Sequence, residues 1–305
     1  MVAIPRDQLQ RYALLSIAAA VVVVSLKGVA FWLTGSVGLL SDALESLVNV
    51  AAAVATWLAV SLAARPPDED HAFGHDKIEF FASGFEGALI LTAALGIFWA
   101  AVPRLLAPLP MEAAGLGLAV SAVASFINLW VAMTLLRAGK KHHSMALSAD
   151  GRHLLTDVWT SVGVLTGLVL TAVTGWNVLD PMIALLVGCY VVWIGGRLIW
   201  EAVHALLDKA LPTDQMDAVN EVLARYASEQ VQFHALRTRW AGARQFVSFH
   251  VLVPDAWTVR RGHDLLEEIE ADLRAVLPSG IIFTHLEPID DPASWDDEHL
   301  DRLEG

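Results

Sequence analysis

Two apolar segments of the chain carry ionisable side chains at one-turn spacing. His153 and Asp157 lie four residues apart in GRHLLTDVWTSVGVLTGLVL, and an earlier segment carries Asp42, Glu45 and Asn49 at intervals of three and four residues. On a helix, each set forms one stripe. If the two helices face each other, two carboxylates, one imidazole and one amide oxygen converge, which is a suitable ligand set for a divalent ion such as zinc.

An ionisable side chain in the middle of a membrane costs about 2.5–3.5 kcal/mol, and it persists where it is paired or used. The alternative to a metal site is that both stripes are hydrogen-bonded contacts between packed helices. Polar groups at one-turn spacing on both helices favour the metal site. Asp42 and Glu86, the latter within SGFEGALI, are auxiliary candidates. Glu86 could restore the negative charge that Asn49 does not supply, or it could line a wet cavity without touching an ion.

A second candidate cluster lies in the loop RPPDEDHAFGHDK (65–77). Asp68, His71 and His75 have the spacing D-x-x-H-x-x-x-H, in which a histidine pair and a nearby carboxylate supply three metal ligands. A solvated loop without a metal is the alternative reading, but the loop directly follows the acidic membrane segment. Lys77 is expected to be a salt-bridge partner, because an ammonium group repels cations.

The last third of the chain holds a third group of candidate ligands. They are His234, His250, His263, His285 and Glu287, spread over three predicted strands and one helix. Adjacent strands of one sheet could bring His234, His250 and His285 together. Scattered surface histidines are the alternative.

Six apolar segments long enough to span a bilayer must position the first group. They are 12–33, 38–62, 80–103, 113–136, 153–175 and 181–200. The connections alternate between nearly neutral segments and segments that carry Lys and Arg. The positive-inside rule therefore places both termini in the cytoplasm of a multi-pass membrane protein.

The pattern changes after residue 200. It predicts helices over 213–228 and 260–277 and strands over 231–240, 244–253 and 281–288. The order α-β-β-α-β indicates a small two-layer α+β domain. The expected organisation is an all-α transmembrane domain over 1–203, a cytoplasmic α+β domain over 204–290, and an acidic, disordered tail over 291–305.

Composition excludes several classes of protein. The 305 residues are 55% hydrophobic with a mean hydropathy of +0.52, and the net charge of −13 argues against a nucleic-acid partner. The one cysteine, Cys189, excludes disulfides within the chain and a Cys-rich zinc site. The sequence has no H-E-x-x-H, nucleophile elbow or P-loop, so an enzyme is not expected. A metal site inside membrane spans suits a transporter, with a metal channel and a metal-sensing structural membrane protein as alternatives.

Four segments resemble the cation diffusion facilitator family: TGSVGLLSDALESLVNV, RPPDEDHAFGHDKIE, ADGRHLLTD and LLDKALP. The similarity covers nearly the whole chain and is greatest to the bacterial zinc/iron-efflux branch. It implies a six-span homodimer in the bacterial inner membrane with a metallochaperone-like cytoplasmic domain. Its substrate would be Zn²⁺, or in other branches Fe²⁺, Mn²⁺, Co²⁺, Cd²⁺ or Ni²⁺, exported from the cytoplasm in exchange for protons. Metal would also act as a regulator.

The resemblance assigns the candidate residues to three sites and one contact. The transport site maps to Glu45, Asn49, His153 and Asp157, and the loop site maps to Asp68, His71 and His75. The cytoplasmic site maps to His234, His250, His285 and Glu287, with His263 as a bridging candidate. Lys77 and Asp208 match positions whose salt bridge holds the dimer together at the membrane surface.

The second span departs from the family pattern. The family usually places Asp or His first and Asp second, where this chain has Glu45 and Asn49. Glutamate is longer by one methylene group and asparagine is uncharged. The substitution therefore bears on the choice of metal, and Asp42 or Glu86 is expected to substitute if the usual ligand set is incomplete.

Overall fold

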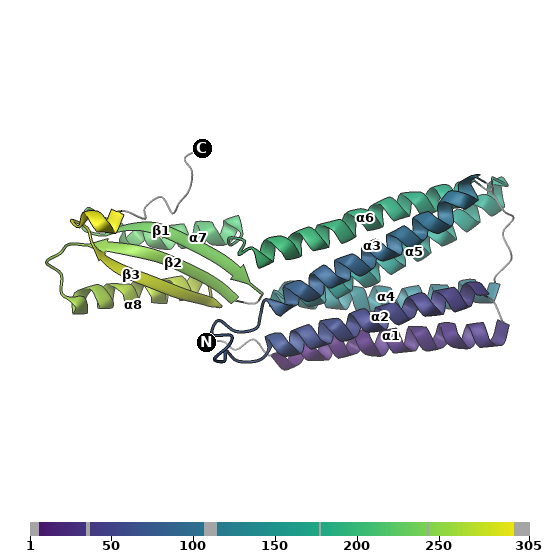
Figure 1. Cartoon of the computed structure of the whole chain (residues 1–305), viewed down its shortest axis with the longest axis horizontal. Helices are drawn as coiled ribbons and strands as arrows, with labels where there is room; N and C mark the ends of the chain where they lie inside the picture. Colours follow the sequence, from purple (N-terminus) through teal and green to yellow (C-terminus); the bar gives the residue numbers. More distant parts are fainter. Residues whose placement is uncertain (1–5, 35–36, 107–114, 177, 243, 296–305) are drawn as a thin grey trace. The chain divides into compact units, whose positions relative to one another are not determined.

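The computed structural model describes residues 6–34, 37–106, 115–176, 178–242 and 244–295. Inside these ranges, the side chains of residues 6, 7, 34, 37–45, 115–118, 164, 165, 167–169, 171, 172 and 180 are not described. The chain divides into two compact units, residues 4–203 and a second unit that holds residues 204–305 with residues 1–3. The first unit is helical and the second combines helices with a sheet, as the sequence predicted (Figure 1).

The first unit consists of six long helices. They are α1 (Arg6–Thr34), α2 (Val37–Ala63), α3 (Ile78–Leu106), α4 (Gly115–His142), α5 (Met145–Thr174) and α6 (Leu179–Leu206). The shortest has 27 residues and the longest has 30. At 1.5 Å per residue each is about 40–45 Å long, which exceeds the hydrocarbon thickness of a bilayer.

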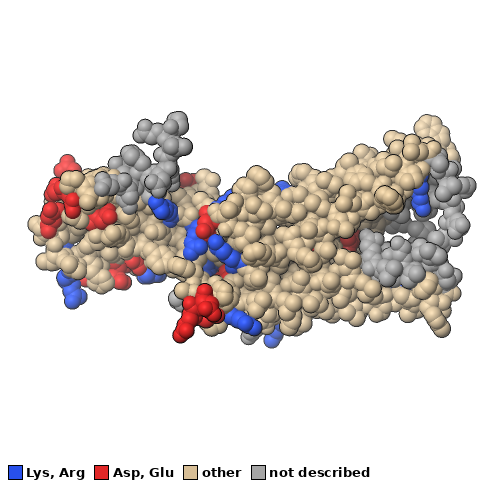
Figure 2. Space-filling view, viewed as in Figure 1, with Lys and Arg blue, Asp and Glu red and all other residues tan. Residues whose placement is uncertain are grey.

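Five helices in the described part of the chain are apolar and long enough to cross a membrane, namely α1, α2, α3, α4 and α6. The fifth helix, α5, is equally long, but its first half carries Asp150, Arg152, His153 and Asp157. Several side chains in its second half lie outside the described residues. A membrane span over 153–175 therefore stays a prediction. Figure 2 shows that the visible surface of the helices carries few charged residues between their ends.

Small residues allow the helices to pack closely. In Figure 1, α1, α2 and α4 form one side of the bundle and α3, α5 and α6 form the other, and α5 also packs extensively on α4. A methyl group at Gly151 of α5 would lie 3.1 Å from the Ala132 carbonyl oxygen and 2.9 Å from Leu136 Cγ, both on α4. A larger residue at position 151 would force α4 and α5 apart.

The second unit has the predicted order of elements. It contains α7 (Thr213–Tyr226), β1 (Gln232–Ala241), β2 (Arg244–Val253), α8 (Val259–Val276) and β3 (Gly280–Pro288). The central strand β2 pairs antiparallel with β1 and parallel with β3. Parallel neighbours need a long crossover, which α8 supplies.

Alternation along β2 divides its side chains between the two faces of the sheet. Val247, Phe249, Val251 and Val253 are buried in one core with residues of α7 and α8. His250 lies between two of these residues in sequence, so its side chain lies on the opposite face, away from the helices. The sheet thus provides one face for packing and a second face for polar groups.

The start of the tail lies within the described residues. Residues Pro292–Trp295 form a 3-10 helix, and the Trp295 Nε1–H donates a hydrogen bond to the Ile289 carbonyl oxygen at 3.0 Å. Disorder of the tail over 291–305 stays a prediction, and within it residues 292–295 form this short helix. Residues 296–305 lie outside the described part of the chain.

Candidate metal sites

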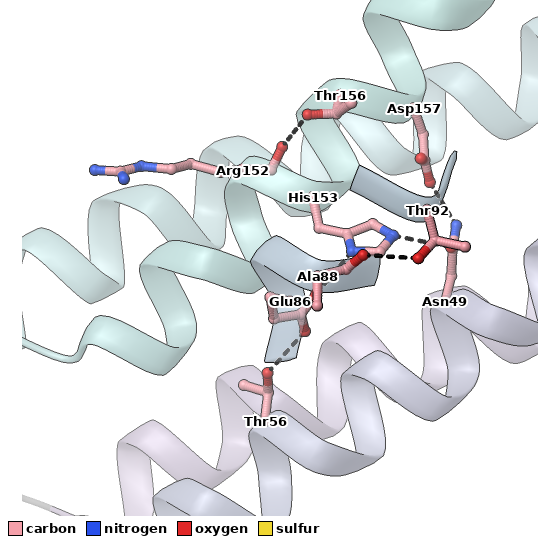
Figure 3. Close-up of polar contacts among 9 residues, drawn as sticks. All are labelled: Asn49, Thr56, Glu86, Ala88, Thr92, Arg152, His153, Thr156 and Asp157. Atoms are coloured by element: carbon pink, nitrogen blue, oxygen red, sulfur yellow. Dashed lines mark hydrogen bonds and ion pairs between the residues drawn. The ribbon is translucent and has the colours of Figure 1, made fainter. Parts of the chain in front are cut away.

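Polar side chains from three helices meet inside the helical unit (Figure 3). The Asn49 Nδ2–H of α2 donates a hydrogen bond to the Asp157 carboxylate of α5. On its other side, the Asn49 Oδ1 lies 3.1 Å from the His153 Nε2. The structure thus brings together three of the four residues predicted for the transport site.

The fourth predicted residue, Glu45, lies on α2 one turn before Asn49. Its side chain and that of Asp42 lie outside the described residues. Their contribution to the site therefore stays a prediction.

Glu86 of α3 completes the cluster from the opposite edge of the imidazole. Its Oε2 lies 2.7 Å from the His153 Nδ1, and its Oε1 accepts a hydrogen bond from the Thr56 hydroxyl at 3.2 Å. Glu86 and Thr56 are 0% exposed, and His153 is 5% exposed. The sequence placed Glu86 among the auxiliary candidates, and the structure places it against the imidazole on the side away from Asn49.

A second buried acid, Glu79, was absent from the predicted sites. It lies in the first turn of α3 and is 3% exposed, and its carboxylate accepts hydrogen bonds from the Ser144 hydroxyl and from the Ala146 N–H at 3.2 Å. These groups lie at the start of α5, where backbone N–H groups have no partner within the helix. Glu79 therefore caps α5 from a neighbouring helix. Within the sequence, its position at the polar end of an apolar run was the only signal.

The loop cluster forms as its spacing predicted. Asp68 Oδ1 accepts a hydrogen bond from the His71 backbone N–H at 2.7 Å and lies 3.2 Å from the His71 Nδ1, while Oδ2 lies 3.3 Å from the His75 Nε2. One ligand atom from each of these residues lies within 4.8 Å of the others. Gly74, with φ of 87°, allows the turn that returns His75 to the cluster.

Electrostatics at the loop favour the ionised acid. The hydrogen bond from the His71 backbone is the main cause that holds the pKa of the Asp68 carboxyl below its ordinary value, with further contributions from the side chains of His71 and His75. Asp68 and His71 are more than half exposed. An ion in this cluster would be in direct contact with solvent.

The ligand cluster of the second unit is built by strand register. His234 of β1 pairs with His250 of β2, which pairs with His285 of β3, so the three residues form a row across the sheet. Glu287 Oε2 lies 2.8 Å from the His234 Nε2 and 3.2 Å from the His250 Nδ1. His234, His250 and Glu287 offer ligand atoms within 4.8 Å of one another.

Two features next to this row shape the cluster. Register shifts between His234 and Arg237, where Ala235 has φ of 52°, as at a β-bulge that re-aims the neighbouring side chain. The second feature is the Trp295 ring, whose centroid lies 5.8 Å from that of the His234 ring. His285 is 65% exposed, and its Nδ1 lies 3.6 Å from the Glu287 Oε1.

The remaining predicted residues lie apart from these clusters. His263 is exposed on α8 and does not join the ligand row within the chain, so its bridging role stays a prediction. Asp208 accepts a hydrogen bond from the Arg239 guanidinium at 3.2 Å. Lys77 and Asp208 lie in different units, and their predicted salt bridge stays a prediction.

Comparison with known proteins covers both units. Residues 13–207 match the family description "cation efflux transmembrane domain", and residues 211–289 match "cation efflux protein, cytoplasmic domain". An uncharacterized transporter of Synechocystis sp. (strain PCC 6803) is 52% identical over 292 residues, 96% of this chain and 94% of that protein. The cation-efflux pump FieF of Serratia proteamaculans is 33% identical over 276 residues, which are 90% of this chain and 91% of the relative. FieF of Klebsiella pneumoniae (strain 342) is 31% identical over 278 residues, with shares of 91% and 92%.

Proposed function

Because the chain belongs to the cation efflux (cation diffusion facilitator) family, and is therefore a divalent metal cation exporter and not an enzyme, we propose that it exports Zn²⁺ in exchange for protons. The proposed working form is a homodimer in the inner membrane of a bacterium, with both termini in the cytoplasm. The basic residues gathered in alternate connections support this orientation.

The meeting of His153, Asn49 and Asp157 inside the helical unit carries the proposal. Imidazole nitrogen and carboxylate oxygen are zinc ligands, and four such groups form a tetrahedral site. Glu45 is the proposed fourth ligand, because it precedes Asn49 by one turn on the same helix. Ligands drawn from α2 and α5 allow the site to be assembled and separated by a relative movement of these two helices.

His153 supplies the coupling between metal and proton. With the amide of Asn49 oriented toward Asp157, the Asn49 Oδ1 accepts a hydrogen bond from the His153 Nε2. A nitrogen that carries a proton cannot also bind a metal ion. Metal entering from the cytoplasm therefore displaces a proton from Nε2, and a proton entering from the other side displaces the metal.

Charge balance sets the energetics of this exchange. If two protons enter for each divalent ion that leaves, the cycle is electrically neutral and the pH gradient drives it. If one proton enters, one unit of charge moves outward against an inside-negative potential, at a cost of about 2.3 kcal/mol per 100 mV.

The other two clusters have roles outside the transport step. The solvent-exposed loop cluster of Asp68, His71 and His75 would gather ions near the entrance. The row of His234, His250 and Glu287 would act as a metal sensor in the cytoplasmic domain. Metal would neutralise negative charge there and draw the two cytoplasmic domains of a dimer together.

Flux measurements in proteoliposomes test the proposal. The full chain is reconstituted with a trapped zinc dye or a trapped pH dye, and Zn²⁺ is added with and without a pH gradient. We expect saturable Zn²⁺ flux that rises with the opposing proton gradient, and no flux above empty liposomes for D157A. Flux that is linear in Zn²⁺ and indifferent to pH would indicate a channel instead.

Asn49 favours a second candidate, an exporter selective for another divalent metal. An amide oxygen is a neutral and harder ligand than imidazole or thiolate, and such oxygen donors suit Mn²⁺ better than zinc. The same liposomes, presented with Zn²⁺, Fe²⁺, Mn²⁺, Co²⁺, Cd²⁺ and Ni²⁺ in turn, decide between the two candidates. A KM for another ion that is lower than the KM for Zn²⁺ would establish the second.

A further inference from the structure

Glu86 has no place in the transport step as described so far, yet it makes the closest contact to His153. Its Oε2 lies 2.7 Å from the His153 Nδ1, and the carboxylate is 0% exposed. Glu86 belongs to α3, whereas the proposed ligands belong to α2 and α5. A third helix therefore reaches the imidazole from its far edge.

The two edges of the imidazole face different partners. Nδ1 faces Glu86, and Nε2 faces Asn49, which in turn contacts Asp157 (Figure 3). When a histidine binds a metal through Nε2, its proton resides on Nδ1, and a carboxylate that accepts this proton fixes the tautomer and the ring orientation. Glu86 lies at the position that this arrangement requires.

Both oxygens of Glu86 are already engaged. Oε1 accepts a hydrogen bond from the Thr56 hydroxyl, and Oε2 contacts the imidazole. Direct ligation by Glu86 would require the carboxylate to leave both partners and to reach past the ring to the Nε2 side. The contacts therefore favour a role that acts through His153.

The backbone that carries Glu86 has little freedom to move. A methyl group on the next residue, Gly87, would lie 2.9 Å from the Gly195 carbonyl oxygen and 2.8 Å from Ile199 Cγ1, both on α6. Close packing of α3 on α6 thus holds the carboxylate in place. Supporting groups on such a rigid element give a precise ligand geometry.

We propose that Glu86 is a positioning residue of the transport site, which holds the His153 ring with Nε2 directed toward Asn49 and Asp157 and does not itself bind the metal. This inference rests on the proposed function, because it assigns His153 as a metal ligand. This role differs from the two that the sequence left open for Glu86, namely a ligand that restores negative charge and a residue that lines a wet cavity.

A double-mutant cycle tests the proposal. Zn²⁺ affinity is measured by competition with a chelating dye on the detergent-solubilised full chain. The background is H75A/H250A, which removes one histidine from each of the other two clusters. In this background E86A, H153A and E86A/H153A are compared. We expect E86A to weaken Zn²⁺ binding by roughly 10–100-fold, the usual effect of losing such a partner. In the presence of H153A, we expect E86A to have no further effect.

Matched variants separate positioning from folding. E86Q keeps an oxygen that can accept a hydrogen bond from Nδ1, so its affinity should lie between those of the wild type and E86A. E79A removes an equally buried glutamate from the same helix, whose partners Ser144 and Ala146 are not proposed ligands. We therefore expect E79A to lower thermal stability and to leave Zn²⁺ affinity unchanged.

Three results would overturn the proposal. They are unchanged affinity in E86A, an equal loss from E86A with and without His153, and an E79A loss as large as that of E86A. The second result would indicate direct ligation by Glu86, and the third would indicate a general structural effect. Failure of the proposed function is separate, because it would show as no Zn²⁺ binding in the H75A/H250A background and no Zn²⁺ flux in the wild type.

Discussion

Asn49 is the uncharged member of the proposed transport site. Its amide bridges an imidazole and a carboxylate, donating to Asp157 and accepting from His153. An aspartate at this position would present a second carboxylate to Asp157. The amide therefore keeps the empty site free of one pair of opposed negative charges.

The substitution N49D should make the stability of the folded chain depend more strongly on bound metal. Without a metal ion, two carboxylates face each other, and the free energy of unfolding should fall by about 1–3 kcal/mol. Added Zn²⁺ neutralises the pair and should restore stability, because the ion binds the folded state. Thermal unfolding of the full chain, with chelator and then with Zn²⁺, measures both effects. N49A serves as the control, because it loses the hydrogen bonds without adding charge. Equal metal-induced stabilisation in N49D and N49A would contradict the prediction.

Asp68 should remain ionised at unusually low pH. The His71 backbone N–H lowers the pKa of the carboxyl in the folded chain. Its stabilising contribution is therefore complete above the unfolded-state pKa and is lost as the pH falls through the lower, folded-state pKa. Carboxyl ¹³C NMR of the chain in nanodiscs should show Asp68 titrating below a free aspartate. The variant H71A should retain most of the lowering of the Asp68 pKa, because alanine keeps the backbone N–H that donates to the carboxylate. Titration at or above the ordinary aspartate value would refute the assignment.

The residue clusters differ in how far the sequence could predict them. Asp68, His71 and His75 are close in sequence, so spacing alone predicted their meeting. Glu86 and His153 are on separate helices, and their contact depends on how α3 is rotated about its axis. Spacing within either helix carries no information about that rotation, and for this reason the far-edge contact to the imidazole was missed.

At the scale of elements, the ends of α5 show the limits of hydropathy. The apolar pattern predicted a span over 153–175, whereas α5 begins at Met145. Hydropathy follows contact with lipid, but helix formation follows backbone hydrogen bonding, which continues through polar residues. His153 consequently lies two turns inside the helix.

The cap at the start of α5 should be important for stability. E79A removes a buried carboxylate that accepts from the Ser144 hydroxyl and the Ala146 N–H. We expect a loss of about 1–3 kcal/mol in the free energy of unfolding, the usual cost of leaving such donors unsatisfied. Denaturation monitored by circular dichroism measures the loss. S144A removes one of the two partners and should cost less. If E79A were as stable as the wild type, Glu79 would not be a cap.

The sequence predicted the order of elements in the second unit better than it predicted how the helices of the first unit pack. Alternating strands and an amphipathic helix predicted the order α-β-β-α-β, and the structure confirms it. Register could not be predicted, because the bulge near Ala235 shifts the pairing of β1 by a residue. The row of three histidines depends on that register.

At the scale of the whole molecule, the chain combines a helical unit with a separately folded α+β unit. Each unit has its own hydrophobic core and its own candidate ligands. The sequence predicted this division from the fall in hydropathy after residue 200. We therefore expect that the proposed transport and sensing roles can be removed separately by substitution.

Metal should bring the cytoplasmic domains of a dimer closer together. Zn²⁺ bound at His234, His250 and Glu287 would neutralise negative charge and reduce repulsion between the two copies. Spin labels on an exposed face of α7 and double electron–electron resonance give the distance between copies with and without Zn²⁺. We expect a shorter distance in the wild type and no change in H250A, which should still transport at saturating Zn²⁺. A distance unaffected by Zn²⁺ in the wild type would contradict the sensor role.

The absence of a side chain at Gly151 has a mechanical consequence. Because Gly151 allows α5 to pack directly on the backbone of α4, we expect these two helices to move together, whereas α2 packs most extensively on α1. His153 and Asp157 would then move with α5, and Asn49 would move with α2. If α2 and α5 moved apart, the proposed ligands would separate, and the metal ion would lose its coordination as the site opened.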